Sequence, residues 1–249
     1  MRTIRGFTRL ALLAVLTSAI AAHASTITVN ATDVIYAAGT QSSLAATAGG
    51  TVPSDVSAAG VASFTFSVTG SAILDVGSGN NSNDADGAGA GVGSSSNTGY
   101  GSISGITAPD AGYLVGVFLA ASGPTGSAPA SLNFSTLGTN FTSLSPLLDQ
   151  VFFIGDGLTG DGTGSTQTFY VPTGATELYL GISDAPAYNG SPANGGYGDN
   201  SGSFSVTDNA ILTAGVATPE PSSLLLLGTG MLGLLGAVAV RRRAPTRAV

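Results

Sequence analysis

Three side chains near the end of the central region carry oxygen donors of the kind that bind hard cations. Asp184 follows one alternating apolar segment, and the neighbours Asp199 and Asn200 precede the next one. Carboxylate and amide oxygens suit Ca²⁺. Two buried carboxylates without a cation repel each other, and one tends to protonate. A bound Ca²⁺ removes that conflict and leaves positions open for two vicinal sugar hydroxyls, and Tyr188 or Tyr197 is available to stack on the sugar.

The charge distribution excludes most other chemistry. Residues 25–240 contain no cationic side chain and carry all fourteen carboxylates of the chain. The chain has no Lys or Cys, and its only histidine, His23, lies in the N-terminal segment. Nucleic-acid binding requires cations to neutralise phosphates. A catalytic triad, a P-loop and a His/Cys zinc set each lack an essential residue. We therefore expect a non-enzymatic binding domain. The basic residues are Arg2, Arg5, Arg9, Arg241, Arg242, Arg243 and Arg247.

The region between the ends shows β patterning throughout, and no stretch of it has a helical period. Residues 64–69, 178–182 and 203–207 alternate apolar and polar side chains, as half-buried strands do. Gly, Pro, Asn and Asp punctuate the region densely, which is typical of short strands joined by turns. The sequence predicts an all-β antiparallel sandwich. Further strands are expected at 27–36, 114–119, 151–154 and 168–171.

Each of two Asp-Gly segments outside these strands could be either a calcium site or a simple loop or turn. Residues 77–101 are rich in Gly, Ser and Asn, which predicts a solvated loop, and residues 83–87 within it spell Asn-Asp-Ala-Asp-Gly. Residues 156–162 carry two further Asp-Gly steps. Carboxylates so spaced suit calcium, but neither segment has the other ligand positions of an EF-hand. The simpler readings are a flexible insertion for the first and turn chemistry for the second.

The segment from 178 to 206 resembles the carboxy-terminal signature of calcium-dependent, galactose-binding bacterial lectins of the PA-I galactophilic type. It reads Leu-Tyr-Leu-Gly-Ile-Ser-Asp, a loop, and then Gly-Tyr-Gly-Asp-Asn-Ser-Gly-Ser-Phe-Ser-Val. That resemblance implies a small β-sandwich in which Asp184, Asp199, Asn200 and the Gly196 carbonyl hold Ca²⁺. Sugar hydroxyls would complete the calcium shell. The lectins' sugar-contacting histidine has no counterpart in this chain.

The N-terminal residues form a predicted signal peptide, residues 1–24. Three arginines precede an apolar stretch from 10 to 22, and Ala22-His23-Ala24 fits the small-x-small pattern recognised by signal peptidase. Cleavage after Ala24 leaves an exported domain of residues 25–215.

The C-terminal residues 216–249 form the most specific motif in the chain. Pro219-Glu220-Pro221 is followed by apolar and small residues at 222–240 and by a basic tail at 241–249 that begins Arg241-Arg242-Arg243. As a helix, 222–240 is about 28 Å long, close to the thickness of the bilayer core, with the basic residues on the cytoplasmic side.

These three parts resemble the PEP-CTERM sorting signal of Gram-negative bacteria. The resemblance implies an exosortase that cuts near the motif, after the chain has been anchored in the inner membrane. The exported domain is then released, or transferred to the cell surface or extracellular matrix.

Together these features predict an exported lectin-like protein that binds Ca²⁺ and an extracellular polysaccharide, associated with exopolysaccharide or biofilm. A structural surface or matrix protein with no specific ligand is the alternative. A glycosidase acting through two carboxylates ranks third, and an ice-binding protein ranks fourth.

Overall fold

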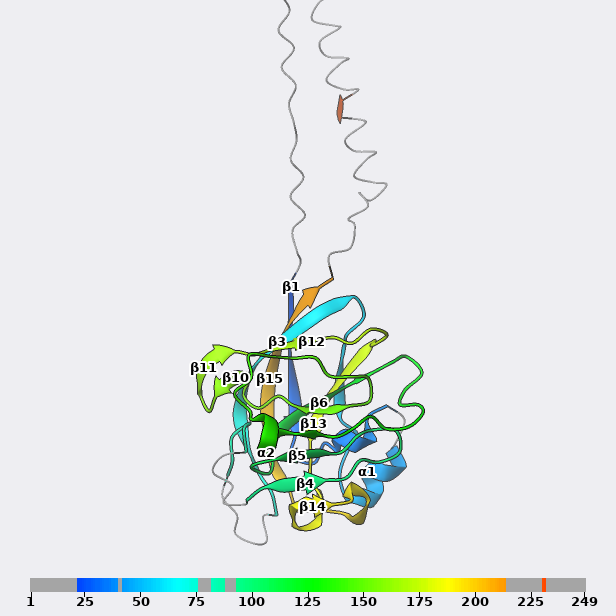
Figure 1. The fold of residues 1–249 in the computed structure, drawn as a ribbon, viewed down its shortest axis with the longest axis vertical. Helices are drawn as coiled ribbons and strands as arrows, with labels where there is room; N and C mark the ends of the chain where they lie inside the picture. Colours follow the sequence, from blue (N-terminus) through cyan, green and yellow to red (C-terminus); the bar gives the residue numbers. More distant parts are fainter. Residues whose placement is uncertain (1–21, 40–41, 76–81, 88–92, 214–229, 232–249) are drawn as a thin grey trace, which may run out of the picture. The chain divides into compact units, whose positions relative to one another are not determined.

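The computed structural model describes residues 22–39, 42–75, 82–87, 93–213 and 230–231. Ile20–Thr213 form one unit of the chain, and its described part is mostly β (Figure 1). The predicted sorting motif and basic tail, and all of the predicted membrane span except residues 230–231, lie outside the described residues. Within the described residues, no helix has the length and apolarity needed to cross a membrane.

Two main sheets build the domain. The strands are β1 (Ala22–Asn30), β2 (Ser54–Ser57), β3 (Val61–Ile73), β4 (Ser95–Asn97), β5 (Ile106–Ala108), β6 (Leu114–Leu119), β7 (Leu132–Asn133), β8 (Ser143–Leu144), β9 (Val151–Phe153), β10 (Leu158–Gly160), β11 (Thr163–Thr166), β12 (Thr168–Tyr170), β13 (Glu177–Ile182), β14 (Asn189–Gly190) and β15 (Ser201–Leu212). The first sheet has the order β1-β15-β3-β12-β8 and the second the order β2-β13-β6-β9. All pairs in these two sheets are antiparallel except β12 with β8.

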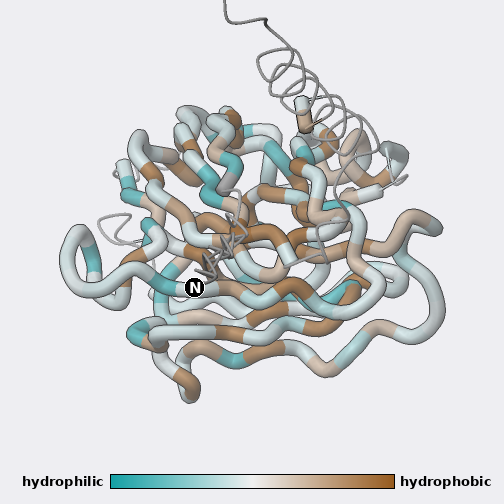
Figure 2. The backbone as a smooth tube through the Cα atoms, turned by 90° about the horizontal axis from the view of Figure 1, so that it is seen from above, coloured by the Kyte–Doolittle hydropathy of each residue, from teal (hydrophilic) through white to brown (hydrophobic). Residues whose placement is uncertain are grey.

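The two main sheets share one apolar core, as a sandwich requires. Inward positions alternate along β13 and β15 with more exposed ones, which is the period-2 pattern that the sequence shows. Aromatic rings cross from sheet to sheet: Phe64 of β3 lies 6.2 Å from Phe118 of β6, and Phe152 of β9 lies 5.6 Å from Phe169 of β12. Figure 2 shows brown, apolar stretches gathered in the interior of the domain and white or teal stretches in many of its outer loops.

A third, smaller sheet lies near the candidate site. Its order is β14-β4-β5-β7, and its β14–β4 and β5–β7 pairs are parallel. A separate hairpin joins β10 and β11. The fold is therefore less uniformly antiparallel than the sequence predicted. β4 also lies inside the segment predicted to be a solvated loop, and its Ser95 and Asn97 side chains are buried.

The described residues also contain short helices, which the sequence analysis did not predict. They are the α-helices α1 (Ser42–Ala48) and α2 (Phe134–Leu137), and the 3-10 helices η1 (Ile35–Ala37), η3 (Pro186–Tyr188) and η4 (Pro192–Asn194). Helix α1 buries Leu44, Ala45 and Ala48. A helix of seven residues is too short to establish a 3.6-residue period, so its pattern cannot be recognised in the sequence.

The first strand is shorter at its C-terminal end than predicted. β1 ends at Asn30 because the Asn30 N–H donates to the Asp33 carboxylate at 2.7 Å and the Asp33 N–H donates to the Asn30 carbonyl at 2.9 Å. This β-turn, closed by the backbone bond from Asp33 to Asn30 and capped by the Asp33 carboxylate, diverts the chain into η1. At its other end β1 includes Ala22 and Ala24, which pair with Ile211 and Asn209 of β15. Cleavage after Ala24 would therefore remove the first three residue pairs of this ladder.

Candidate calcium and ligand site

The candidate site lies where β13 ends and β15 begins. The loop of residues 183–200 leaves β13, passes through η3, β14 and η4, and returns to the start of β15. Tyr197 ties the two ends of this loop together, since its hydroxyl accepts from the Asp184 N–H at 2.9 Å and donates to the Ile182 carbonyl at 2.9 Å. The Tyr197 N–H donates to the carbonyl of Ala48, the last residue of α1.

Tyr197 is therefore part of the core and does not stack on a sugar. Its side chain has no exposed surface, and burial raises the pKa of its phenol far above the ordinary value. The sequence-based assignment of this residue to ligand contact was wrong, because a buried Tyr in a strand-loop-strand motif has the same sequence signature as an exposed one. Its structural role is to hold Asp184 in place.

Asn200 is also a support of the site. Its amide nitrogen donates to Asp184 Oδ2 at 2.9 Å and to the Ala31 carbonyl at 3.2 Å, and its amide oxygen accepts from the Asp75 N–H at 3.2 Å. The chemistry of these partners determines the orientation of the amide, because two are acceptors and one is a donor. Asn200, predicted as a calcium ligand, thus accepts a backbone hydrogen bond with its amide oxygen, and its amide nitrogen orients the carboxylate of Asp184.

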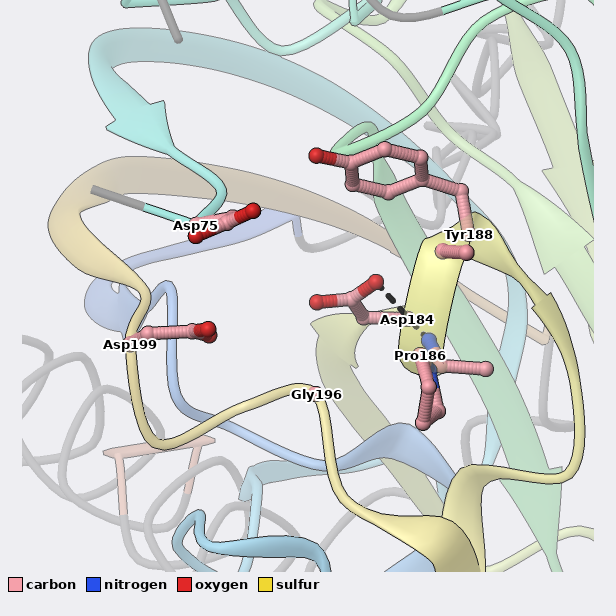
Figure 3. Close-up of a pocket in the computed structure, with 8 residues that line it drawn as sticks. Asp75, Asp184, Pro186, Tyr188, Gly196 and Asp199 are labelled. Carbon is pink, nitrogen blue, oxygen red and sulfur yellow. Dashed lines mark hydrogen bonds between the residues drawn. The ribbon is translucent and has the colours of Figure 1, made fainter. Parts of the chain in front are cut away.

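The other predicted residues line one pocket of about 310 Å³, together with Asp75. In Figure 3 the carboxylates of Asp75, Asp184 and Asp199 point toward one open space, with Tyr188 on one side and Gly196 on the other. The pocket is lined by Asp75, Asp184, Ala185, Pro186, Ala187, Tyr188, Gly196 and Asp199. Four predicted residues, Asp184, Tyr188, Gly196 and Asp199, are thus brought together.

Gly196 allows the two sides of the loop to approach closely. Its φ is +116°, and a Cβ added there would lie 2.9 Å from the carbonyl carbon of Ala185. An L-residue is strained in that conformation and has no room for its side chain. The requirement for glycine here comes from the geometry of the loop and is independent of any metal.

Asp75 is a pocket-lining residue that the sequence analysis missed. It lies two residues beyond β3, and Ile73 of β3 pairs with Ser201 of β15. This pairing places Asp75 beside Asn200 and Asp199, although more than 120 residues separate them in the chain. Only the long-range register of β3 on β15 brings Asp75 to the pocket, so no local pattern identifies it.

The electrostatics of the pocket favour a bound proton or cation. Burial is the main cause that raises the pKa of Asp184 to about 7, hydrogen bonds from Asn200 and the Ala185 N–H oppose it, and the charges of Asp199 and Asp75 add to it. All seven arginines of the chain lie outside the described residues. Three carboxylates therefore share a pocket with no Lys or Arg side chain from the described part of the domain.

A buried hydrogen-bond network holds the start of the 183–200 loop. Ser183, next to Asp184, bonds through its hydroxyl to the Tyr36 hydroxyl at 2.7 Å and accepts from the Asn97 amide nitrogen at 2.8 Å. These residues come from η1, β4 and the end of β13, and all three side chains are buried. These buried hydrogen bonds restrict the position of the neighbouring carboxylate, although the Asn97 amide oxygen has no hydrogen-bond partner among the described residues.

Comparison with known proteins identifies the C-terminal segment. Residues 217–243 match the family described as the PEP-CTERM protein-sorting motif. This match includes the predicted Pro219-Glu220-Pro221 motif and Arg241–Arg243. The chain is therefore an exported protein that an exosortase processes, and it is anchored in a membrane before it is sorted. No curated protein matches the chain, and no solved structure does.

Proposed function

We propose that the β domain is a non-enzymatic, calcium-dependent carbohydrate-binding module that acts at the surface or in the extracellular polysaccharide of a Gram-negative bacterium. The observation that carries this proposal is the convergence of Asp75, Asp184 and Asp199 on one pocket (Figure 3). Asp184 and Asp199 come from opposite ends of one loop and Asp75 comes from the end of β3, and the domain supplies no Lys or Arg to neutralise them. A hard divalent cation meets that need with oxygen ligands.

In the proposed site, protein oxygens would bind Ca²⁺ on one side and sugar hydroxyls would bind it on the other. Asp184 is held by Asn200 and the Ala185 N–H at 2.9 and 2.8 Å, whereas Asp199 is exposed. Ca²⁺ takes six to eight oxygens, so three carboxylates and the Gly196 carbonyl leave positions for two vicinal hydroxyls. Tyr188 lines the same pocket and is partly exposed, so it is the aromatic residue placed to contact the sugar.

Titration of Ca²⁺ into the full chain, purified in detergent and stripped of metal with a chelator, tests the cation step. We expect Asp199→Asn to weaken this binding at least tenfold. Asp55→Asn removes the same charge from an exposed position on β2 and should leave it unchanged. A glycan array probed with and without Ca²⁺ tests the sugar step. Calcium binding at the pocket without calcium-dependent glycan binding would reject the lectin function and keep the metal site.

A structural coat protein is the second candidate function, and the outer face of the first sheet favours it. Thr26 and Thr28 of β1 align with Thr207 and Ser205 of β15 and with Ser67 and Thr69 of β3. These side chains are exposed or half-buried, and the Thr26 and Thr207 hydroxyls bond to each other at 3.0 Å. A face of uncharged hydroxyls suits hydration or contact with a matrix without a specific pocket.

A further inference from the structure

Asp208 is a buried carboxylate at a position of β15 where the alternation of the strand calls for an apolar side chain. The neighbouring inward positions are Phe204, Val206 and Ala210, and all of them are buried. Asp208 itself is only 4% exposed. Its ladder partner on β3 is the buried Phe66. A buried carboxylate costs free energy unless a donor or a cation satisfies it, so this position requires a partner.

Ser25 is the partner that β1 supplies. It lies directly opposite Asp208 in the β1–β15 ladder, and its hydroxyl donates to Asp208 Oδ2. Three covalent bonds separate the main-chain nitrogen of Ser25 from its own Oγ, which keeps these two atoms within roughly 4 Å of each other. A charge on this nitrogen would therefore lie within about 6 Å of the carboxylate, a range in which opposite charges stabilise each other.

Removal of the signal peptide would place a positive charge on that nitrogen. The predicted cut after Ala24 makes Ser25 the first residue, and an α-amino group with an ordinary pKa of about 7.7–8.0 is mostly protonated at neutral pH. Residues 25–240 contain no Lys, Arg or His. The new ammonium group would thus be the one cation in this part of the chain, and it would form opposite a buried carboxylate.

A pocket of about 460 Å³ beside Asp208 provides the space for this contact. Its lining includes His23, Ala24 and Ser25 of β1, Asp208 of β15 and the apolar side chain of Val56 on β2. Cleavage removes His23 and Ala24, so Asp208 is then the one titratable side chain among the lining residues. Because Ser25 is exposed, its ammonium group keeps part of its hydration, which lowers the desolvation cost of the pair.

We propose that Asp208 is a binding site for the α-ammonium group that signal-peptide cleavage creates at Ser25. The pair would fasten the new end of β1 to β15 at the point where cleavage removes three residue pairs of the ladder. In the uncleaved chain the same nitrogen belongs to an uncharged peptide bond, so the pair forms only after processing. This proposal rests on the predicted cleavage after Ala24 and does not depend on calcium or sugar binding.

Chemical labelling of the amine tests the proposal directly, because a chain without Lys has a single primary amine at its N-terminus. The chain is exported by a bacterial host and purified in detergent, and mass spectrometry should find Ser25 as its first residue. The pH dependence of acylation gives the pKa of the amine. We expect this pKa to be at least one unit higher in the native chain than in guanidinium chloride. Asp208→Asn should remove most of that difference, whereas Asp199→Asn, at an exposed position before β15, should keep it.

A double-mutant cycle separates the ion pair from a purely structural role of Asp208. Ala22→Leu with Ala24→Leu blocks cleavage, since signal peptidase requires small residues at these positions. At pH 7, Asp208→Asn should lower the Tm of the processed chain by about 2–4 °C and that of the uncleaved chain by less than half as much.

Three results would overturn the proposal. They are a first residue other than Ser25, an amine with the same pKa in the native and the denatured chain, and a raised pKa that persists in Asp208→Asn. If Asp208→Asn does not fold, the comparison of native and denatured unmodified chain still decides, because an ion pair at the amine requires a higher native pKa.

Discussion

At the scale of single residues, the site separates side chains that face the pocket from side chains that hold them. Asp184 faces the pocket, and it is buried by the residues that hydrogen-bond to it. Asn200 and Tyr197 resemble ligands in the sequence, but in the structure they position Asp184 through its carboxylate and its backbone N–H. Polar residues that are neighbours in one motif can therefore be exposed to solvent or buried, and the fold decides which.

Calcium binding at the pocket should depend on pH through Asp184. The pKa of this carboxyl is about 7 because it is buried, and Ca²⁺ requires the ionised form, so protons compete with the metal. Lowering the pH from 8 to 6 should weaken binding about tenfold, which follows from competition at one site with that pKa. Calorimetry at both pH values measures it. An affinity for this site that is the same at pH 6 and pH 8 would show that Asp184 is not a ligand.

The two tyrosines should respond oppositely to substitution. Tyr197→Phe leaves the Asp184 N–H and the Ile182 carbonyl without their buried partner, and it should lower the free energy of unfolding by about 1–3 kcal/mol. Urea denaturation measures this loss. Tyr188→Ala should instead weaken glycan binding with a smaller effect on stability. Equal stability of Tyr197→Phe and the unmodified chain would contradict the role of its hydroxyl.

At the scale of elements, the loop from β13 to β15 is built as a separate small structure. It is long enough to include η3, β14 and η4, and β14 pairs with β4 of the third sheet. Its two ends are closed by Tyr197, and the Ala48 carbonyl of α1 receives the Tyr197 N–H. The pocket is therefore supported by both main sheets, by the third sheet and by α1.

Asn200→Asp distinguishes a supporting role from a ligand role. Asn200 donates to Asp184 and to the Ala31 carbonyl, and an aspartate there would place an acceptor against two acceptors. We expect a loss of about 1–3 kcal/mol in the free energy of unfolding without metal, measured by denaturation in a chelator. Asp199→Asn, at the neighbouring exposed position, is the control. Tighter calcium binding with unchanged metal-free stability would instead identify Asn200 as a ligand.

At the scale of the whole domain, acidic residues dominate the charge. Burial raises the pKa values of Asp86, Asp110, Asp149, Glu177 and Asp184. The described part of the chain offers no Lys or Arg to counter this effect. Protons or divalent cations are the counter-charges that such a domain can accept.

The metal-free domain should become less stable as the pH rises. Asp184 and Asp86 have folded-state pKa values of about 7, above the usual 3.8, so the folded state binds protons more tightly than the unfolded state. Their stabilising contribution is complete below about pH 4 and is lost progressively as the pH rises through 7. Thermal unfolding in a chelator at pH 5 and pH 8 tests this, and added Ca²⁺ should reduce the difference. Higher metal-free stability at pH 8 would contradict it.

The sequence by itself determined the β class, the approximate position of the strands of six or more residues (β1, β3, β6, β13 and β15) and the sorting tail, because these depend on local signals. Side chains alternate within a strand such as 178–182, and the PEP-CTERM motif is contiguous. The short helix α1 and β4 were missed because each is too short for its period to be recognised. Asp184, Tyr188, Gly196 and Asp199 were correctly grouped, since one loop carries all four.

Only the tertiary structure decided which residues complete the sites and which support them. Asp75 reaches the pocket through the pairing of β3 with β15, and Ser25 reaches Asp208 through the pairing of β1 with β15. The burial of Tyr197 and the orientation of the Asn200 amide also depend on partners far away in the chain. The physical reason is that strand register and core packing act over long sequence separations, whereas a local motif specifies only its own residues.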